Sequence, residues 1–399
     1  MDYTQSRSPL LAWLMALLLA IALLLTGCDL PQVSAEDRLF LNLSLDFLDE
    51  YQLPPTKFEG TPVGGLSALT YDRQLDRFYA LSDDRSEFAP ARFYTLKLTL
   101  NPLAALKPQI QSQIQIQIQK AEIENVTFLM DEDGKPFAKG TIDPEGLIVS
   151  PLRSIFVSSE GVTRAGIPPF VREFNLKTGQ WQRSLPIPER YLPDAKGQPQ
   201  TKGVQDNLGL EALTVTPGTY AAGEPFRVFT ATESSLLEDK EELKPGQGAK
   251  SRMLHYYVDA DRATVLSEHL YVLDPLPEGA VMTGLTELLA IDQGGHFLSL
   301  ERSFGPAGFQ VKLFQLSLGG ATDITRQASL VGTQSGIQPI DKKLLLNLSE
   351  LGIPLDNLEG MTLGPRLPDK SQSLLLISDD NFQPKQVTQI LLFRLRGVA

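Results

Sequence analysis

Short stretches of apolar residues, or of alternating apolar and polar residues, recur along the chain, and each ends at Gly, Pro, Asp or Asn. Runs of this kind with β-branched and aromatic residues are typical of β-strands. The predicted strands are Arg77–Leu81, Phe93–Leu98, Ser154–Ser158, Phe226–Ala231, Phe297–Leu300, Val311–Leu318, Leu374–Ser378 and Ile390–Leu395. Long helical periodicity is scarce after residue 27, so the pattern predicts an all-β fold.

One further stretch, Gln109–Lys120, alternates Gln and Ile with a period of two (QIQSQIQIQIQK). The alternation places the isoleucines on one face and predicts a half-buried strand, although its low complexity also suits an exposed sheet edge. Two segments rich in Pro, Gly, Lys and Gln, Tyr191–Asn207 and Leu237–Ser251, are predicted surface loops.

An internal repeat organises these strands. Five times the chain shows a small residue, then Leu or Met, then usually Thr, opening an apolar run. The copies are Ser67–Thr70 (SALT), Glu145–Ile148 (EGLI), Glu211–Thr214 (EALT), Thr283–Thr286 (TGLT) and Glu359–Thr362 (EGMT). Their Leu or Met positions are 78, 66, 72 and 76 residues apart. In each unit a second strand follows and ends in a carboxylate, at Asp83, Glu160, Glu233, Glu301 and Asp379.

Repeated all-β units of four strands are typical of a β-propeller. The sequence therefore predicts a propeller of five four-stranded blades. Because a blade usually has about 40–50 residues, a sixth blade hidden in the long units is one alternative, and a β-sandwich with chance similarity is another. The last unit lacks one strand, and Leu39–Leu53 is predicted to return and close the ring.

The first two strands of a blade form an antiparallel hairpin beside the central channel. The start of the first strand and the end of the second strand therefore lie at the same end of that hairpin. Acidic residues occupy these positions in every unit, and about ten carboxylates should ring one mouth of the channel. The candidate metal ligands are Asp83, Asp84, Asp143, Glu145, Glu160, Glu211, Glu233, Glu301, Glu359, Asp379 and Asp380.

Carboxylates this close cannot all stay ionised without a bound cation or raised pKa values. Hard oxygen ligands favour calcium, so calcium is the predicted cofactor. The candidate catalytic residues are Glu145, Glu211, Glu359, Arg85 and Arg302, where the two arginines would grip an anionic group. The alternative is that single acids cap turns or form ion pairs with Arg85, Arg153, Arg164 or Arg302.

The amino terminus is predicted to be a targeting segment. Leu10–Leu25 is a run of sixteen residues that are nearly all apolar, which is short for a membrane span and suits a secretory signal. Leu25-Thr26-Gly27-Cys28 is similar to a bacterial lipobox, in which the cysteine is lipidated. We expect residues 1–27 to be a signal peptide, 28–38 a tether and 39–399 one domain, lipid-anchored at Cys28 on the periplasmic or extracellular face of the bacterial envelope. An uncleaved signal anchor is the alternative.

Composition excludes several classes of function. The chain of 399 residues has 36 Lys+Arg against 48 Asp+Glu, a formal net charge of −12, and no clustered basic residues, which argues against a nucleic-acid partner. One cysteine permits neither an internal disulfide nor a cysteine-rich zinc site. His255, His269 and His296 lack zinc-binding spacing, and no GxSxG motif is present.

Several of these segments, in order, resemble the phytase-like family, described as having esterase-like activity of phytase. The matching segments are Gly64–Leu69, Ser82–Arg85, Asp143–Gly146, Asn207–Leu213, Leu300–Arg302, Glu359–Met361 and Ser378–Phe382. The resemblance spans about residues 45–396. It implies a propeller in a secreted or periplasmic setting and the hydrolysis of phosphate or other esters.

The sequence thus predicts a calcium-dependent hydrolase of a small anionic or ester substrate at an acidic channel mouth. The first alternative is a non-catalytic, envelope-anchored propeller that binds a ligand or protein, since one fold hosts many functions. An enzyme should concentrate polar groups in the channel mouth, whereas an interaction module should expose an apolar face. A propeller oxidoreductase with a quinone cofactor is the second alternative.

Overall fold

The computed structural model describes residues 13–15, 17, 39–103, 115–218, 221, 223–332 and 335–398. Its contacts divide the chain into two units, Met1–Leu39 and Phe40–Ala399. The predicted lipobox, Cys28 and almost all of the predicted tether and signal peptide lie outside the described residues. No helix among the described residues has the length and hydropathy needed to cross a membrane.

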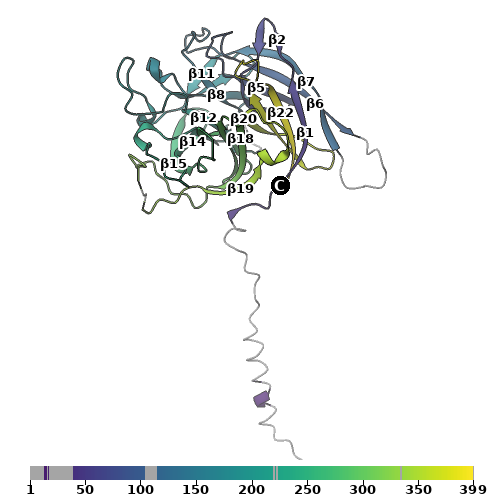
Figure 1. Cartoon of the computed structure of the whole chain (residues 1–399), viewed down its shortest axis with the longest axis vertical. Coiled ribbons are helices and arrows are strands. Elements are labelled where there is room, and N and C mark those ends of the chain that lie inside the picture. The colour runs from purple at the N-terminus through teal and green to yellow at the C-terminus, as the bar shows by residue number, and fades with distance from the viewer. Residues whose placement is uncertain are drawn as a thin grey trace, which may run out of the picture. The chain divides into compact units, whose positions relative to one another are not determined.

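Five four-stranded antiparallel sheets make up the second unit (Figure 1). Blade 1 is β4 (Leu66–Asp72), β5 (Arg77–Ser82), β6 (Arg92–Leu103) and β7 (Gln115–Phe128). Blade 2 is β8 (Pro144–Val149), β9 (Ser154–Ser159), β10 (Phe170–Asn175) and β11 (Trp181–Ser184). Blade 3 is β12 (Leu210–Val215), β13 (Phe226–Thr232), β14 (Lys250–Val258) and β15 (Ala263–Val272). Blade 4 is β16 (Met282–Ala290), β17 (His296–Gly305), β18 (Gly308–Ser317) and β19 (Asp341–Asn347).

Blade 5 combines the two ends of the domain. It consists of β20 (Asn357–Arg366), β21 (Gln372–Asp379), β22 (Thr388–Arg396) and β1 (Ser44–Leu53). Strand β1 pairs with β22 from Ser44 opposite Arg396 to Leu53 opposite Thr388, which confirms the predicted closure of the ring by an N-terminal strand. The remaining elements are a hairpin of β2 (Thr56–Phe58) and β3 (Thr61–Val63) and four short 3-10 helices at Thr163–Ala165, Glu189–Tyr191, Leu237–Asp239 and Leu348–Leu351.

The fold is therefore a five-bladed β-propeller, and neither the β-sandwich nor a sixth blade is present among the described residues. The units are long because loops join or cover the blades, such as the segments between β11 and β12 and between β18 and β19. The innermost strands β4, β8, β12, β16 and β20 contact one another in sequence and around to β4, which forms the wall of the central channel.

The threonine of the repeat has a structural role between blades. The hydroxyl of Thr70 in β4 accepts a hydrogen bond from the backbone N–H of Val149 in β8, at 3.4 Å. In the same way Thr214 in β12 accepts one from Ala290 in β16, at 3.0 Å. Buried N–H groups of the inner strands need partners, and in blades 1 and 3 the threonine of the repeat supplies one.

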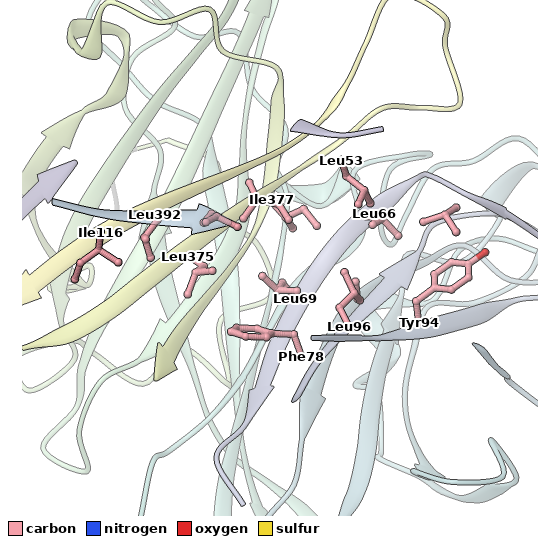
Figure 2. Close-up of a cluster of buried hydrophobic side chains, with 14 of the residues drawn as sticks. Leu53, Leu66, Leu69, Phe78, Tyr94, Leu96, Ile116, Leu375, Ile377 and Leu392 are labelled. Carbon is pink, nitrogen blue, oxygen red and sulfur yellow. The ribbon is translucent and has the colours of Figure 1, made fainter. Parts of the chain in front are cut away.

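Apolar side chains fill the spaces between neighbouring blades. The cluster between blades 1 and 5 in Figure 2 joins Leu69 and Phe78 of blade 1 to Leu375, Ile377 and Leu392 of blade 5. All five are at most 2% exposed, because each blade buries both faces of its middle strands against its neighbours. Burial of this kind, at roughly 25 cal/mol per Å² of apolar surface, is the main stabilising contribution.

The alternating Gln and Ile residues are confirmed as a half-buried edge strand over the part that the structure describes, Gln115–Lys120. Ile116 and Ile118 are 1% and 5% exposed, whereas Gln117 is exposed. Strand β7 is also the outer strand of blade 1, and the backbone N–H of Ile118 donates to Asp49 of blade 5, at 2.7 Å. Residues 109–114 of this prediction lie outside the described residues.

Gly146, the small residue of the second repeat, sits where inner strands approach closely. A Cβ at Gly146 would lie 2.3 Å from the Ser158 hydroxyl and 2.6 Å from the Glu211 carbonyl oxygen. Because backbone cannot yield as a flexible side chain does, Gly146→Ala is expected to lower the free energy of unfolding by about 1–3 kcal/mol. Urea unfolding measures the change. Gly319→Ala, whose Cβ would meet only the Ser317 hydroxyl at 3.9 Å, is the control, and equal stability of the two variants would contradict the expectation.

Candidate functional site

The mouth of the channel opens into a cavity of about 820 Å³. It lies where the first strands of the blades begin and the second strands end, as the hairpin geometry predicted. Nine of the eleven predicted metal ligands line it: Asp83, Asp84, Asp143, Glu145, Glu160, Glu211, Glu233, Glu359 and Asp379. The convergence of these acids, although they are spread over almost 300 residues of sequence, follows from the repeat.

A β-bulge near the start of the first strand aims one set of acids at the cavity. In blade 3 the pairing shifts between Leu210 and Ala212, and in blade 5 between Leu358 and Gly360. The residues left unpaired by these shifts are Glu211 and Glu359. A bulge kinks the strand and redirects the side chain of its extra residue. Blade 2 has the corresponding shift around Glu145, and blade 1 has it at Ser67.

The second set of acids comes at the end of the second strand, and the backbone opposite leaves room for it. Asp83, Glu160 and Glu233 directly follow β5, β9 and β13, and Asp379 is the last residue of β21. A Cβ on Gly65 would lie 2.1 Å from the Asp83 carboxylate, and one on Gly284 equally close to that of Glu233. Glycine at these positions therefore makes space for the carboxylate.

Blade 4 departs from the predicted register. Its bulge falls between Leu285 and Glu287, so Thr286, and not Thr283, corresponds to Glu211 and Glu359. Glu301 pairs opposite Leu285, and its carboxylate accepts hydrogen bonds from the Tyr271 hydroxyl of blade 3 and from Lys342 of β19 in blade 4, both at 2.6 Å. The predicted place of Glu301 at the channel mouth is thus wrong, because the pairing makes Glu301 equivalent to Thr232 and makes Arg302, one residue later, equivalent to Glu233.

Arg302 takes the position that acids hold in the other blades. Its guanidinium lies 2.9 Å from Glu359 and 3.5 Å from Glu233, and the residue is 8% exposed. Among the described residues, no atom forms a hydrogen bond with its Nε. The neighbouring carboxylates raise the pKa of Arg302, so it stays charged. One side of the ring therefore carries a fixed positive charge.

Two other predicted ligands have different surroundings. The carboxylate of Asp84 forms a buried ion pair with Arg92 at 2.6 Å and accepts backbone hydrogen bonds from Glu87 and Ala89. Asp380 does not line the cavity and instead accepts backbone hydrogen bonds from Gly65 at 2.8 Å and Phe382 at 3.0 Å. Both acids order the loops at the rim, as the turn-capping alternative proposed for single acids.

The remaining acids form three overlapping groups in which one carboxylate oxygen from each residue lies within 4.8 Å of the others. The groups are Asp143, Glu145 and Glu160; Glu145, Glu211 and Glu359; and Glu160, Glu211 and Glu233. Burial raises the pKa of every member, to about 6 for Asp143 and about 7 for Glu233, and the other carboxylates of the cavity raise most of them further. Burial likewise raises the pKa of Asp83 and Asp379.

Arg85 is fixed at the opposite side of the cavity. Its guanidinium donates to both carboxylate oxygens of Asp143, at 2.5 Å each, and to the amide oxygen of Asn207 at 2.6 Å. The ion pairs of Arg85 and Arg302 are those that the alternative interpretation anticipated. By contrast, Arg153 pairs with Asp72 and Arg164 with Asp206, neither of which lines the cavity.

Sequence reasoning missed Asn357 and the aromatic residues of the rim. Asn357 donates to Glu359 at 2.8 Å, and its buried Oδ1 has no hydrogen-bond partner. It stands two residues before the bulge, as Asp143 does in blade 2, so the repeat contained a signal for it. Phe88, Phe304, Phe309 and Phe382 also line the cavity, but they come from loops and strand ends without a repeat. None of the three histidines lines it.

Comparison with solved structures finds chains of similar fold at low identity. A GH62 hydrolase in complex with xylotriose is 11% identical, with a TM-score of 0.41, over 87% of this chain and 96% of that one. The catalytic domain of the Coprinopsis cinerea GH62 alpha-L-arabinofuranosidase is 10% identical, with a TM-score of 0.40, over 89% and 97%. Similarity at this level carries no inference about substrate. None of the curated proteins compared matches the chain.

The sequence itself matches a family model over residues 61–382, which is most of the chain. That model is described as phytase-like, with esterase-like activity of phytase. The matched range covers blades 1 to 4, the inner strands of blade 5 and all of the acids that line the cavity. The chain therefore belongs to the phytase-like family, a family described by an esterase-like, and thus hydrolytic, activity.

Proposed function

We propose that the protein hydrolyses phosphate or related esters at the acidic cavity, with calcium held by the carboxylates, outside the cytoplasm. The observation that carries the proposal is the ring of buried acids at the channel mouth, broken at one position by Arg302. The esterase-like family supports the reaction class. The concentration of polar groups in the cavity favours an enzyme over a non-catalytic binding propeller.

The residues present fit a calcium ion. Carboxylate and amide oxygens are its preferred ligands, and the three acid groups supply several within 4.8 Å of one another. The unpartnered Oδ1 of Asn357 adds a buried oxygen that lacks a donor. Asp143, Glu145, Glu160, Glu211, Glu233 and Glu359 are the proposed ligands. Calcium bound there would supply positive charge and a water of lowered pKa.

The chain's own residues would bind the substrate and move the proton. Arg302 lines the cavity, where its guanidinium would donate to a phosphate or ester oxygen of the substrate. Arg85 provides a second positive charge that Asp143 holds in place. Glu145, Glu211 and Glu359, whose pKa values are raised by burial, are the candidates to exchange a proton with the attacking water.

Turnover with and without calcium tests this function. Full-length protein is expected to hydrolyse at least one member of a panel of phosphomonoesters and carboxyl esters, with EDTA reducing the rate at least tenfold and added calcium restoring it. Arg302→Lys is expected to raise KM, because lysine keeps the charge but cannot reproduce the planar donor set. An absence of turnover on the whole panel in calcium would support the non-catalytic alternative instead. Anchoring at Cys28 stays a prediction from the sequence.

A further inference from the structure

The rim of the cavity carries two pairs of aromatic side chains among its polar residues, whereas its floor is acidic. Phe88 is 64% exposed and packs against Phe382 with 4.6 Å between ring centroids. Phe304 is 41% exposed and packs against Phe309 at 5.0 Å, next to Met282 in the cavity lining. Large exposed aromatic side chains are unfavourable in water unless something covers them. Two such pairs therefore border the proposed site, one from blades 1 and 5 and one from blade 4.

The loops hold these aromatic rings in place, in part through backbone conformations that are unfavourable for residues other than glycine. Asn381 and Phe382 both have positive φ angles, 47° and 51°, which disfavour residues other than glycine. Asp380 holds this conformation by accepting the Phe382 N–H at 3.0 Å. The buried Asp84–Arg92 pair fixes the loop of Phe88, whose N–H also donates to Asp84. Strained backbone that the surrounding structure keeps is a pointer to function.

The charges of the residues that line the cavity limit how many anionic groups a substrate can carry. Ten acids but three bases line the cavity, and two of the bases, Arg85 and Arg302, form ion pairs with cavity acids. The third, Lys385, is exposed and has no ion pair among the described residues. Beyond any calcium held by the acids, the side chains of the lining therefore offer few positive charges, which suits one phosphate or carboxyl group better than a polyanion that carries several.

We infer that the substrate is amphiphilic, an ester with one anionic group and an apolar alcohol part that lies against the Phe88–Phe382 and Phe304–Phe309 pairs. The inference rests on the proposed function, which places the ester group at the acids of the cavity. It extends that function by naming the substrate class and the residues that select it. A polyphosphorylated polyol would lack both the apolar contact and sufficient positive charge.

Binding of alkylphosphonates, which are not hydrolysed, tests the inference independently of turnover. Ethylphosphonate and hexylphosphonate share a head group and differ by four methylenes. By calorimetry on the calcium-loaded, full-length protein we expect hexylphosphonate to bind at least tenfold more tightly, since each buried methylene adds affinity. Phe88→Ala with Phe304→Ala should reduce that ratio to about twofold. Both side chains are largely exposed, so their removal leaves the core intact.

The matched control removes two exposed leucines away from the cavity. Leu243→Ala with Leu344→Ala should keep the tenfold ratio, because neither side chain lines the cavity. Equal affinities for the two phosphonates in the wild-type protein would overturn the inference, as would tighter binding of fructose 1,6-bisphosphate than of hexylphosphonate. The protein could also bind hexylphosphonate more tightly than ethylphosphonate and yet hydrolyse no ester. That result would support the apolar subsite and contradict only the proposed catalysis.

Discussion

Replacing Glu145 and Glu359 together with glutamine is expected to abolish calcium binding and to reduce ester turnover at least a thousandfold. Both residues belong to one group of carboxylates that also contains Glu211, so the double change removes two of its three negative charges while keeping the shape. A thousandfold loss corresponds to about 4 kcal/mol of transition-state stabilisation, a magnitude typical of metal-assisted hydrolysis. Metal analysis after dialysis in calcium, together with steady-state kinetics, measures both effects.

Misfolding would not explain this loss, because buried like charges destabilise the cation-free protein and their removal should raise its stability. The control is Glu189→Gln with Glu242→Gln, which makes the same change of charge at two exposed positions outside the cavity. It should keep calcium and activity. Unchanged calcium content in the Glu145 and Glu359 variant would refute the proposed calcium site.

Without calcium, the stability of the protein is expected to fall as the pH rises from about 5 to 8. The pKa of Glu233 is raised from 4.5 to about 7. Below its unfolded-state pKa the carboxyl is protonated in both states, and as the pH rises toward 7 the unfolded state loses its proton first, so stability is lost. Glu233 alone accounts for on the order of 3 kcal/mol at 1.36 kcal/mol per pKa unit. Asp143 and the other raised carboxylates act in the same direction.

His255 acts in the opposite direction. Burial lowers its pKa from 6.5 to about 4, so it costs stability only as the pH falls below 6.5. The acids of the cavity outnumber it, and their effect dominates. Urea unfolding at pH 5, 6, 7 and 8 in EDTA and in calcium measures the trend, and calcium should flatten it. A stability that rises with pH in EDTA would contradict the raised pKa values.

The architecture could be predicted because a similar four-residue pattern marks the start of the first strand in four of the five blades and lies only three residues away from that place in blade 4. The small residue, the leucine and the threonine are each fixed by contacts between inner strands, such as the hydrogen bond from Val149 to Thr70. Closure by β1 followed from the missing strand in the last unit. The acids could be located because strand ends share a rim, which needs only the order of the strands.

The errors have equally local causes. In blade 4 the repeat was matched at Thr283–Thr286, whereas the bulge places the equivalent four residues at Thr286–Leu289. The pairing of the second strand likewise places Arg302, and not Glu301, at the cavity. The aromatic rim could not be foreseen, because Phe88 and Phe382 meet through loops of different blades whose conformations depend on Asp84 and Asp380.

The pairing of β1 with β22 has a consequence for how the protein is made. Ser44 lies opposite Arg396 in the same sheet, so the first strand to leave the ribosome pairs with the last. Until synthesis has passed Arg396, blade 5 stays open and the ring of inner strands lacks its final support. Contacts over so long a sequence separation also form slowly. Blade 5 therefore cannot close, and the ring cannot be completed, before β22 has been synthesised.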